Sequence, residues 1–439
     1  MTRTQATYIT IAILGRCPRA ATTALVLAIV LVASAVAIPP AEAQTYKVLH
    51  TFTARTDGAS PYAGLLRDGA GNLYGTTYRG GASDIGTVYK IDKTGTESAL
   101  YSFSGCCDVY KNGATPDGGL VRDAAGNLYG TTLEGGAAKS GTVFKLDTAG
   151  TETVIHSFTG TGGDGAEPYA GLIRDAAGNL YGTTIYAGDL ACHPPYGCGT
   201  VFKLDAAGAE TVLYSFTGIG GDGALAYGGL VLDAAGNLYG TTAGGGDLFC
   251  GAGNGCGIVF KLDTTGKETV LHSFTGTGGD GSNPFDALIL DAAGNLYGTT
   301  SSGGDESSCI YGGGGCGTVF KLDTTGKETV LYSFRGSDGA GPFAGLIRDA
   351  AGNFYGTTEF GGDMSCSILG IAGCGTVFKL DTTGKETVLH SFTGSDGANP
   401  VAGLIRDAAG NLYGTTQDGG DLPTCDSEPG CGVVFKLRP

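Results

Sequence analysis

GNLYGTT, at residues 178–184, is one of seven near-identical heptapeptides in this 439-residue chain. Only one copy differs, with phenylalanine in place of leucine. The asparagines of the seven copies are Asn72, Asn127, Asn179, Asn237, Asn295, Asn353 and Asn411. Successive copies are 55, 52, 58, 58, 58 and 58 residues apart, which is the spacing of a repeat protein rather than of unrelated domains.

Each repeat contains four short segments with the character of β-strands. In the third copy they are residues 171–174, 179–184, 199–204 and 211–216. Asp-x-x-Gly turns separate the first pair and the last pair, because glycine supplies the positive φ that a tight hairpin needs. Radial closure of such units protects the sheet edges. We therefore predict an all-β fold, a seven-bladed β-propeller of four-stranded antiparallel blades, with an open β-solenoid as the competing architecture.

The two ends of the repeat array complement each other. The pattern of the outer strand first occurs at residues 46–52, before the first heptapeptide, and it is missing after residues 435–439. Seven copies of every strand therefore exist only if residues 46–52 complete the last blade. This predicts a one-plus-three closure of the ring by the N-terminal strand.

The first 43 residues have the pattern of a signal peptide. Arg3, Arg16 and Arg19 precede an apolar stretch at residues 23–38, and Ala41-Glu42-Ala43 is a small-x-small cleavage site. An uncleaved anchor is the alternative, but the apolar stretch is short for a membrane span. We expect residues 1–43 to be removed, residues 44–439 to form the propeller, and the product to be secreted or periplasmic with no membrane association.

The charge limits the classes of partner. The formal net charge of −16 becomes −18 when three arginines and one glutamate leave with residues 1–43. Nucleic acid and anionic lipid would repel such a chain. A glycan, a cation or a surface protein is the expected partner, and we expect a monomer that requires no cofactor, with Ca²⁺ as the candidate ion.

One set of acidic residues lies in the loops between consecutive repeats, where an Asp-Gly recurs. Its members are Asp57, Asp164, Asp222, Asp280, Asp338 and Asp396, and Asn112 stands in the remaining copy. These loops share one face of a propeller with the loops between second and third strands. We expect the six carboxylates to form a ring near the channel mouth, suited to Ca²⁺ or a cationic ligand. The competing interpretation is ordinary Asp-Gly turn chemistry.

A second acidic set lies in the loops between second and third strands, at Asp189, Asp247, Asp305, Asp363 and Asp421. A cysteine pair follows each of them: Cys192/Cys198, Cys250/Cys256, Cys309/Cys316, Cys366/Cys374 and Cys425/Cys431. An even set of cysteines in an exported chain favours disulfides, and the spacing is not that of a zinc site. We predict five local disulfides that hold these loops in shape for binding. Cys106 and Cys107 are left to form a vicinal disulfide or to link another chain.

No catalytic group stands out. Four of the five histidines occupy an outer-strand position where tyrosine stands in other copies, which indicates packing. Only His193 is singular, and no unique partner for it is visible. The favoured function is a non-enzymatic binding or interaction module that uses the acidic, disulfide-stapled face. A propeller-type lyase or hydrolase, with a metal on that face and His193 as base, is the alternative.

The repeat resembles the GloVer tandem repeat of the Gloeobacter and Verrucomicrobia type. The likeness rests on residues 157–160, 169–184 and 199–205, and the same strings return along residues 44–439. The Asp-x-x-Gly-Asn-Leu-Tyr core also looks like repeats of the NHL and streptogramin-lyase type, which are propellers. The resemblance implies the fold, but it brings no established activity.

Overall fold

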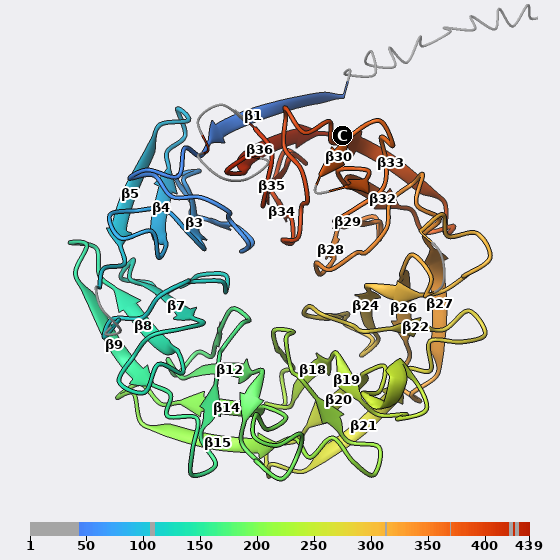
Figure 1. Ribbon diagram of the computed structural model, residues 1–439, viewed down its shortest axis with the longest axis horizontal. Helices are drawn as coiled ribbons and strands as arrows, with labels where there is room; N and C mark the ends of the chain where they lie inside the picture. Colours follow the sequence, from blue (N-terminus) through green and yellow to red (C-terminus); the bar gives the residue numbers. More distant parts are fainter. Residues whose placement is uncertain (1–43, 106–109, 312–313, 369, 421–424, 426–429) are drawn as a thin grey trace, which may run out of the picture. The chain divides into compact units, whose positions relative to one another are not determined.

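Seven four-stranded antiparallel sheets stand around a ring in the computed structural model (Figure 1). The structure describes residues 44–105, 110–311, 314–368, 370–420, 425 and 430–439. The predicted seven-bladed propeller is confirmed. The signal peptide predicted for residues 1–43 lies outside the described residues.

Each blade has a two-residue inner strand and two five- or six-residue central strands. The inner strands are β2 (Leu66–Arg67), β6 (Val121–Arg122), β11 (Ile173–Arg174), β17 (Val231–Leu232), β23 (Ile289–Leu290), β28 (Ile347–Arg348) and β34 (Ile405–Arg406). The second strands are β3 (Leu73–Thr77), β7 (Leu128–Thr132), β12 (Leu180–Thr184), β18 (Leu238–Thr242), β24 (Leu296–Thr300), β29 (Phe354–Thr358) and β35 (Leu412–Thr416). The third strands are β4 (Thr87–Ile91), β8 (Thr142–Leu146), β14 (Thr200–Leu204), β20 (Ile258–Leu262), β26 (Thr318–Leu322), β32 (Thr376–Leu380) and β36 (Val433–Arg438).

The outer strands form the rim of the ring (Figure 1). They are β5 (Glu97–Ser102), β9 (Glu152–Ser157), β15 (Glu210–Ser215), β21 (Glu268–Ser273), β27 (Glu328–Ser333), β33 (Glu386–Ser391) and, from the beginning of the described chain, β1 (Thr45–Thr51). The one helix among the described residues is the short 3-10 turn η1 (Gly251–Gly253). Nothing in this part of the chain forms a helix with the length and apolar character that crossing a membrane requires.

The N-terminal strand closes the ring, as predicted. β1 pairs with β36 in a sheet of order β1-β36-β35-β34. Val48 lies opposite Phe435 and His50 opposite Val434, with a bulge at Leu49. Two segments nearly 400 positions apart in sequence therefore form one blade, and β36 has no free edge.

The heptapeptide recurs because each of its residues has a fixed role. In the third copy, Asp175 accepts hydrogen bonds from the side chains of Asn179 and Tyr181, at 2.6 and 3.1 Å, which fixes the hairpin. A Cβ atom on Gly182 would lie 2.6 Å from the ring of Phe202, so only glycine fits beneath that ring. The hydroxyl of Thr183 donates to a carbonyl of the next blade, that of Gly228. One short string thus sets a turn, a packing layer and a contact between blades.

The core lies between neighbouring blades. A phenylalanine just after each outer strand is fully buried and packs edge-on against an aromatic ring in the third strand of the next blade, at centroid distances from 5.0 to 5.4 Å. These phenylalanines are Phe52, Phe103, Phe158, Phe216, Phe274, Phe334 and Phe392. Such edge-to-face pairs add to the burial of apolar area. The joints of the ring are therefore aromatic and repeat around the whole circle.

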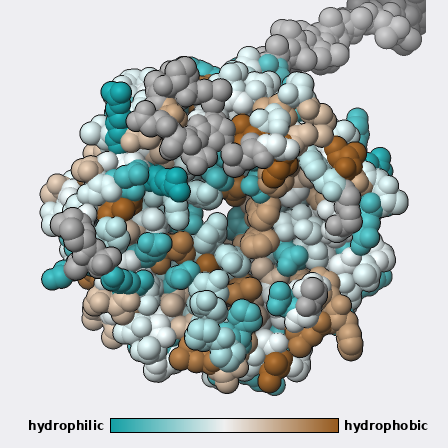
Figure 2. All heavy atoms as spheres, viewed as in Figure 1, coloured by the Kyte–Doolittle hydropathy of each residue, from teal (hydrophilic) through white to brown (hydrophobic). Residues whose placement is uncertain are grey.

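The two loop classes expected on one face do meet. In three blades the loop before the inner strand pairs with the loop after the second strand and forms a small two-stranded ladder. The ladders are β10 (Gly165–Ala166) with β13 (Tyr186–Ala187), β16 (Gly223–Ala224) with β19 (Gly244–Gly245), and β22 (Gly281–Ser282) with β25 (Ser302–Gly303). A fourth ladder, β30 (Ser367–Ile368) with β31 (Ile371–Ala372), lies inside one stapled loop. Figure 2 shows a face of the ring with a hollow near its centre.

Candidate functional site

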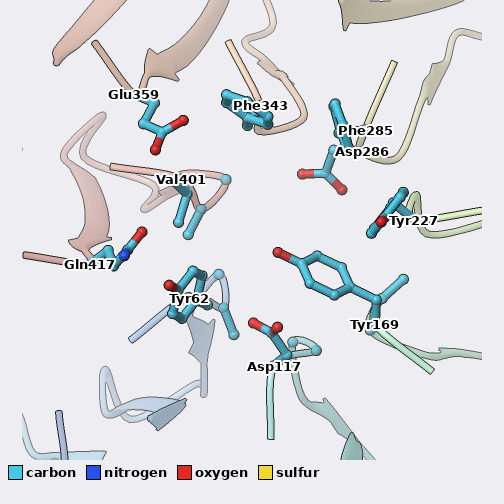
Figure 3. Close-up of a pocket in the computed structure, with 18 residues that line it drawn as sticks. Tyr62, Asp117, Tyr169, Tyr227, Phe285, Asp286, Phe343, Glu359, Val401 and Gln417 are labelled. Atoms are coloured by element: carbon cyan, nitrogen blue, oxygen red, sulfur yellow. The ribbon is translucent and has the colours of Figure 1, made fainter. Parts of the chain in front are cut away.

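A cavity of about 400 Å³ lies where the loops before the inner strands converge (Figure 3). Each of the seven loops contributes the same repeat position, five residues after the Asp-Gly aspartate or its counterpart Asn112. The side chains at this position are Tyr62, Asp117, Tyr169, Tyr227, Phe285, Phe343 and Val401. Glu359 and Gln417, which follow second strands, also line the cavity. The side chains that line the cavity therefore differ between repeats, although seven of them occupy the same repeat position.

Aromatic rings form a continuous arc along one side of the cavity. The ring centroids of Tyr169 and Tyr227 are 5.3 Å apart, those of Tyr227 and Phe285 are 5.1 Å apart, and those of Phe285 and Phe343 are 5.0 Å apart. Tyr62 adds a fifth ring (Figure 3). Burial raises the pKa of Tyr227 to about 12, so its hydroxyl stays neutral and can donate. The five rings offer electron-rich faces and three hydroxyl groups, those of Tyr62, Tyr169 and Tyr227, to a ligand.

Asp117 breaks the aromatic pattern. It is only 6% exposed, and its Oδ1 makes no hydrogen bond among the described residues. Its carboxyl group points into the cavity between Tyr62 and Tyr169 (Figure 3). Burial raises the pKa of Asp117 to about 8. A buried polar group without a partner is costly, and such groups gather at functional sites.

Two further carboxyl groups line the same cavity. Asp286 accepts hydrogen bonds from the backbone N–H groups of Ala287 and Gly345, while burial raises its pKa. Burial and the nearby carboxylate of Asp418 raise the pKa of Glu359 to about 7. No lysine, arginine or histidine is among the described residues of the wall. The cavity therefore suits a cationic or hydrogen-bonding ligand and disfavours an anion.

The Asp-Gly aspartates, which we expected to ring the channel mouth, do not line the central cavity. Each is bonded at the end of its own outer strand: Asp57 to Thr53, Asp164 to Thr159, Asp222 to Thr217, Asp280 to Thr275, Asp338 to Tyr332 and Asp396 to His390. The loop runs inward after the aspartate, so the residue five positions later reaches the centre instead. Asp164 is brought close to His156 and Glu210; ion binding by this set otherwise stays a prediction.

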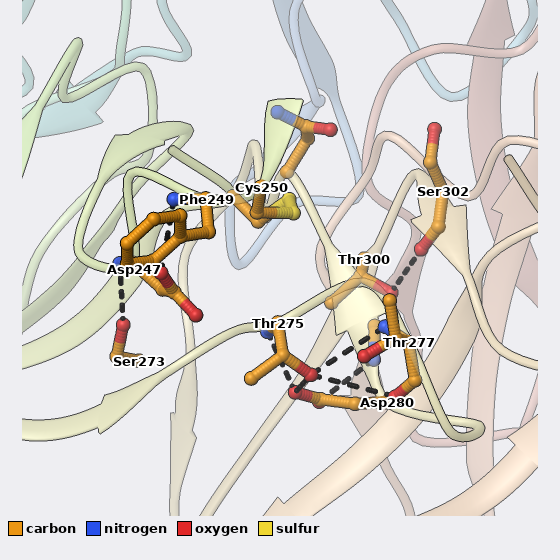
Figure 4. The surroundings of a disulfide bond; sticks show 12 residues. Asp247, Phe249, Cys250, Ser273, Thr275, Thr277, Asp280, Thr300 and Ser302 are labelled. Atoms are coloured by element: carbon orange, nitrogen blue, oxygen red, sulfur yellow. Dashed lines mark hydrogen bonds between the residues drawn. A yellow bond between two sulfur atoms is a disulfide. The ribbon is translucent and has the colours of Figure 1, made fainter. Parts of the chain in front are cut away.

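The second acidic set caps turns in the stapled loops. Oδ1 of Asp189, Asp247, Asp305 and Asp363 each accepts the backbone N–H two residues later, at 2.9 to 3.1 Å. Figure 4 shows Asp247 in this role beside Cys250, with Asp280 bonded to Thr275 nearby. This is turn chemistry, and cation binding by these residues stays a prediction. Asp421 lies outside the described residues.

All five predicted disulfides are present. They join Cys192 to Cys198, Cys250 to Cys256, Cys309 to Cys316, Cys366 to Cys374, and Cys425 to Cys431. Such bonds are typical of oxidising compartments. Cys106 and Cys107 lie outside the described residues, so the alternatives for them stay open.

His193 lines a second cavity of about 400 Å³ together with Cys192 and Leu225, and it does not line the central one.

One stapled loop offers a direct stability test. Replacing Cys250 and Cys256 together with alanine is expected to lower the free energy of unfolding by about 2 kcal/mol, because the bond closes a six-residue separation. Urea denaturation under non-reducing conditions measures this. Full reduction of the unchanged protein opens all five disulfides and gives the largest loss in free energy of unfolding, against which the single-loop variant is compared. An unchanged midpoint would mean that the loop is held by its backbone hydrogen bonds alone.

The central wall was missed in the sequence, although a signal for it exists. Aromatic residues after proline were visible at Tyr62, Tyr169 and Phe343. Asp117 and Asp286 depart from the repeat at adjacent positions of this segment. Aligning the seven segments column by column would have isolated both carboxylates, because functional groups must differ between copies of a repeat.

Comparisons with known proteins identify the repeat and the fold. The Gloeobacter/Verrucomicrobia repeat matches residues 36–194, 109–311 and 309–439. A puromycin hydrolase variant complexed with PGG aligns at 12% identity over 83% of this chain and 50% of that chain, with a TM-score of 0.52. A fungal alcohol oxidase of the AA5 family, in complex with copper, aligns at 16% identity over 90% and 76%, with a TM-score of 0.53.

A gluconolactonase from Xanthomonas campestris aligns at 14% identity over 90% of this chain and 89% of that chain, with a TM-score of 0.41. The search of curated protein sequences returns no match. Identities this low extend the likeness no further than the fold. Since the repeat matches run through the whole ring, the chain belongs to the Gloeobacter/Verrucomicrobia repeat family.

Proposed function

We propose that the protein is a non-enzymatic binding protein whose central cavity takes a small organic cation of the substituted-ammonium class. The observation that carries this proposal is Asp117, a buried carboxyl group with an unbonded oxygen in a cavity walled by five aromatic side chains. Aromatic faces attract ammonium groups, by about 0.5–2 kcal/mol each. A carboxylate beside them supplies the counter-charge that a desolvated cation needs.

The electrostatics around the cavity favour the same class. Asp286 and Glu359 add two acidic groups to the wall, and no basic side chain among the described residues opposes them. The whole chain has a net charge of −16, which draws cations toward it. A neutral glycan brings no positive charge that could pair with Asp117, Asp286 or Glu359. We therefore place the glycan second among ligands.

We infer that the protein works outside the cytoplasm, in the periplasm or beyond the cell. Five disulfides staple the loops that follow second strands, and disulfides persist in oxidising compartments. Preordered loops lose less conformational entropy when a ligand binds. A diffusing solute from outside the cell is the kind of ligand that such a site meets.

One observation favours a hydrolase as the second candidate. Asp117 and Glu359 have raised pKa values, about 8 and about 7, which suit a general acid and a general base near neutral pH. Turnover of a chromogenic glycoside or lactone by the unchanged protein, and its loss in Asp117→Asn, would favour this candidate. Retention of turnover in Asp117→Asn would remove it.

Calorimetric titration with choline tests the proposed ligand class. We expect binding of choline and much weaker binding of its carbon isostere, in which a tert-butyl group replaces trimethylammonium. Phe285→Leu should weaken choline binding by about tenfold through loss of one cation–π contact. Phe249→Leu is the matched control, because Phe249 is fully exposed on a stapled loop and does not line the cavity.

Three results would contradict the proposal. Equal affinity for choline and its isostere would make the site merely apolar. Equal loss in Phe285→Leu and Phe249→Leu would place binding outside the cavity. Saturable binding of a neutral sugar that Phe285→Leu abolishes would favour the glycan instead.

A further inference from the structure

A polar position recurs at the seven junctions between neighbouring blades. It lies in each outer strand and alternates between histidine and tyrosine along the chain: His50, Tyr101, His156, Tyr214, His272, Tyr332 and His390. Its packing neighbour is the phenylalanine two residues later, as in His156 with Phe158 at 4.7 Å. This packing explains why the position is aromatic, but it does not explain why the residue there always carries a polar nitrogen or oxygen atom.

At the tyrosine junctions the polar atom finds a protein partner. The hydroxyl of Tyr332 donates to Asp338 at 2.5 Å, and that of Tyr101 accepts from Asn112 at 3.1 Å. At three histidine junctions the ring nitrogen lies 3.3 to 3.6 Å from the aspartate of the following loop, without forming a hydrogen bond. Nε2 of His50, His156 and His272 is buried and makes no hydrogen bond among the described residues. At the closing junction, His390 bonds to Asp396 and stacks on Tyr46.

One of these three junctions brings a second carboxylate within reach. Nε2 of His156 lies 3.6 Å from Oδ1 of Asp164 and 3.8 Å from Oε2 of Glu210, which enters from the next blade. The three ligand atoms lie within 4.8 Å of one another. In a tetrahedral zinc site with bonds of about 2.1 Å, neighbouring ligand atoms are about 3.4 Å apart. The two separations measured from Nε2 of His156 exceed this value by 0.2 to 0.4 Å, and the two carboxylate oxygens lie within 4.8 Å of each other.

We propose that His156, Asp164 and Glu210 bind one divalent transition-metal ion of the Zn²⁺ class at the junction between two blades. An imidazole nitrogen with two carboxylate oxygens is a donor set that such ions accept, with a fourth position left for water. The ion would be coordinated by Nε2 of His156, which otherwise makes no hydrogen bond among the described residues. It would also tie the outer strands β9 and β15 to each other.

The surroundings hold the donors in place. Oδ2 of Asp164 accepts from the backbone N–H and the hydroxyl of Thr159, at 2.7 and 2.8 Å, which fixes the carboxylate. The three side chains are 14 to 18% exposed, so an ion can enter and still lose most of its water. Outer-shell contacts of this kind orient metal ligands.

The chain contains its own matched controls. His156→Tyr converts the junction into the type found at Tyr101, Tyr214 and Tyr332, so the variant is expected to fold. His272→Tyr makes the same exchange where Nε2 of the histidine lies 3.5 Å from Asp280 and, among the described residues, forms no ion pair with a second carboxylate within 4 Å. Zinc titration of the full chain without a histidine tag should give one saturable equivalent that His156→Tyr loses and His272→Tyr keeps.

Two further measurements locate the ion. Co²⁺ bound in its place should show visible bands of nitrogen and oxygen ligation without the intense near-ultraviolet band of thiolate ligation, which excludes the cysteines. Anomalous scattering at the zinc edge should give a peak beside Nε2 of His156. Absence of a saturable equivalent, its retention in His156→Tyr, or equal loss in His272→Tyr would each overturn the proposal.

Discussion

A chain that begins at Phe52, without β1, is expected to lose the cooperative unfolding of the ring. Val434 and Phe435 in β36 are fully buried and lie opposite His50 and Val48 of β1, so loss of β1 would open this edge of the blade to water. The last blade would keep three strands and expose a free edge, which promotes aggregation. Thermal unfolding followed by circular dichroism, with light scattering, would show an early, concentration-dependent transition.

A point substitution separates closure from a general loss of chain. Phe52 follows β1 and packs on Tyr89 of the next blade, just as Phe216 packs on Phe260 in the middle of the chain. Both are fully buried, so Phe52→Ala and Phe216→Ala should each lower the free energy of unfolding by about 3–5 kcal/mol. A much smaller loss for Phe52→Ala would mean that the N-terminal blade frays independently and that the ring is not closed.

Asp117→Asn is expected to stabilise the protein at pH 8 while it abolishes binding of the organic cation. The carboxyl pKa is about 8 in the folded protein and about 4 in the unfolded chain. Between these two pH values the carboxyl group of Asp117 is ionised only in the unfolded chain. Its contribution therefore lowers the free energy of unfolding as pH rises from about 4 to about 8, and this contribution is constant above about pH 8. The full difference corresponds to at most about 5 kcal/mol. Burial of the asparagine amide reduces the net gain to about 3 kcal/mol.

Urea denaturation at pH 4 and pH 8 measures this effect, and Asp263→Asn is the control because Asp263 caps an exposed turn. The gain of Asp117→Asn should vanish at pH 4. Titration of the unchanged protein with choline at pH 7 should also release about one proton, since the cation draws Asp117 into its ionised form. A gain that is equal at both pH values would show that Asp117 is not protonated in the folded state.

The sequence revealed those features that local strings determine. The heptapeptide, its turns and the cysteine pairs repeat as short words, so the blades, the closing strand and the five disulfides followed from them. The position of the Asp-Gly carboxylates did not, because it depends on where the loop bends inward after Asp57 or Asp164. The alternation of His156 with Tyr214 looked like packing, because the glutamate that faces each of them comes from the next blade.

The central wall was hidden for a different reason. Its chemistry lies in exceptions: Asp117 where five other repeats have an aromatic residue and one has valine, and Asp286 where the others have alanine or glycine. The consensus of the seven repeats does not contain such residues, because each of them occurs in only one copy. Their burial and the rise in pKa arise only when seven distant loops converge.

The seven lining positions belong to seven loops that are each held by their own blade. An exchange at one of them alters a single sector of the wall and leaves the backbone of the other six untouched. Ligand preference in such a molecule can therefore diversify by isolated exchanges, with no need for compensating changes elsewhere. A combinatorial library restricted to residues 62, 117, 169, 227, 285, 343 and 401 would sample new specificities on a constant scaffold.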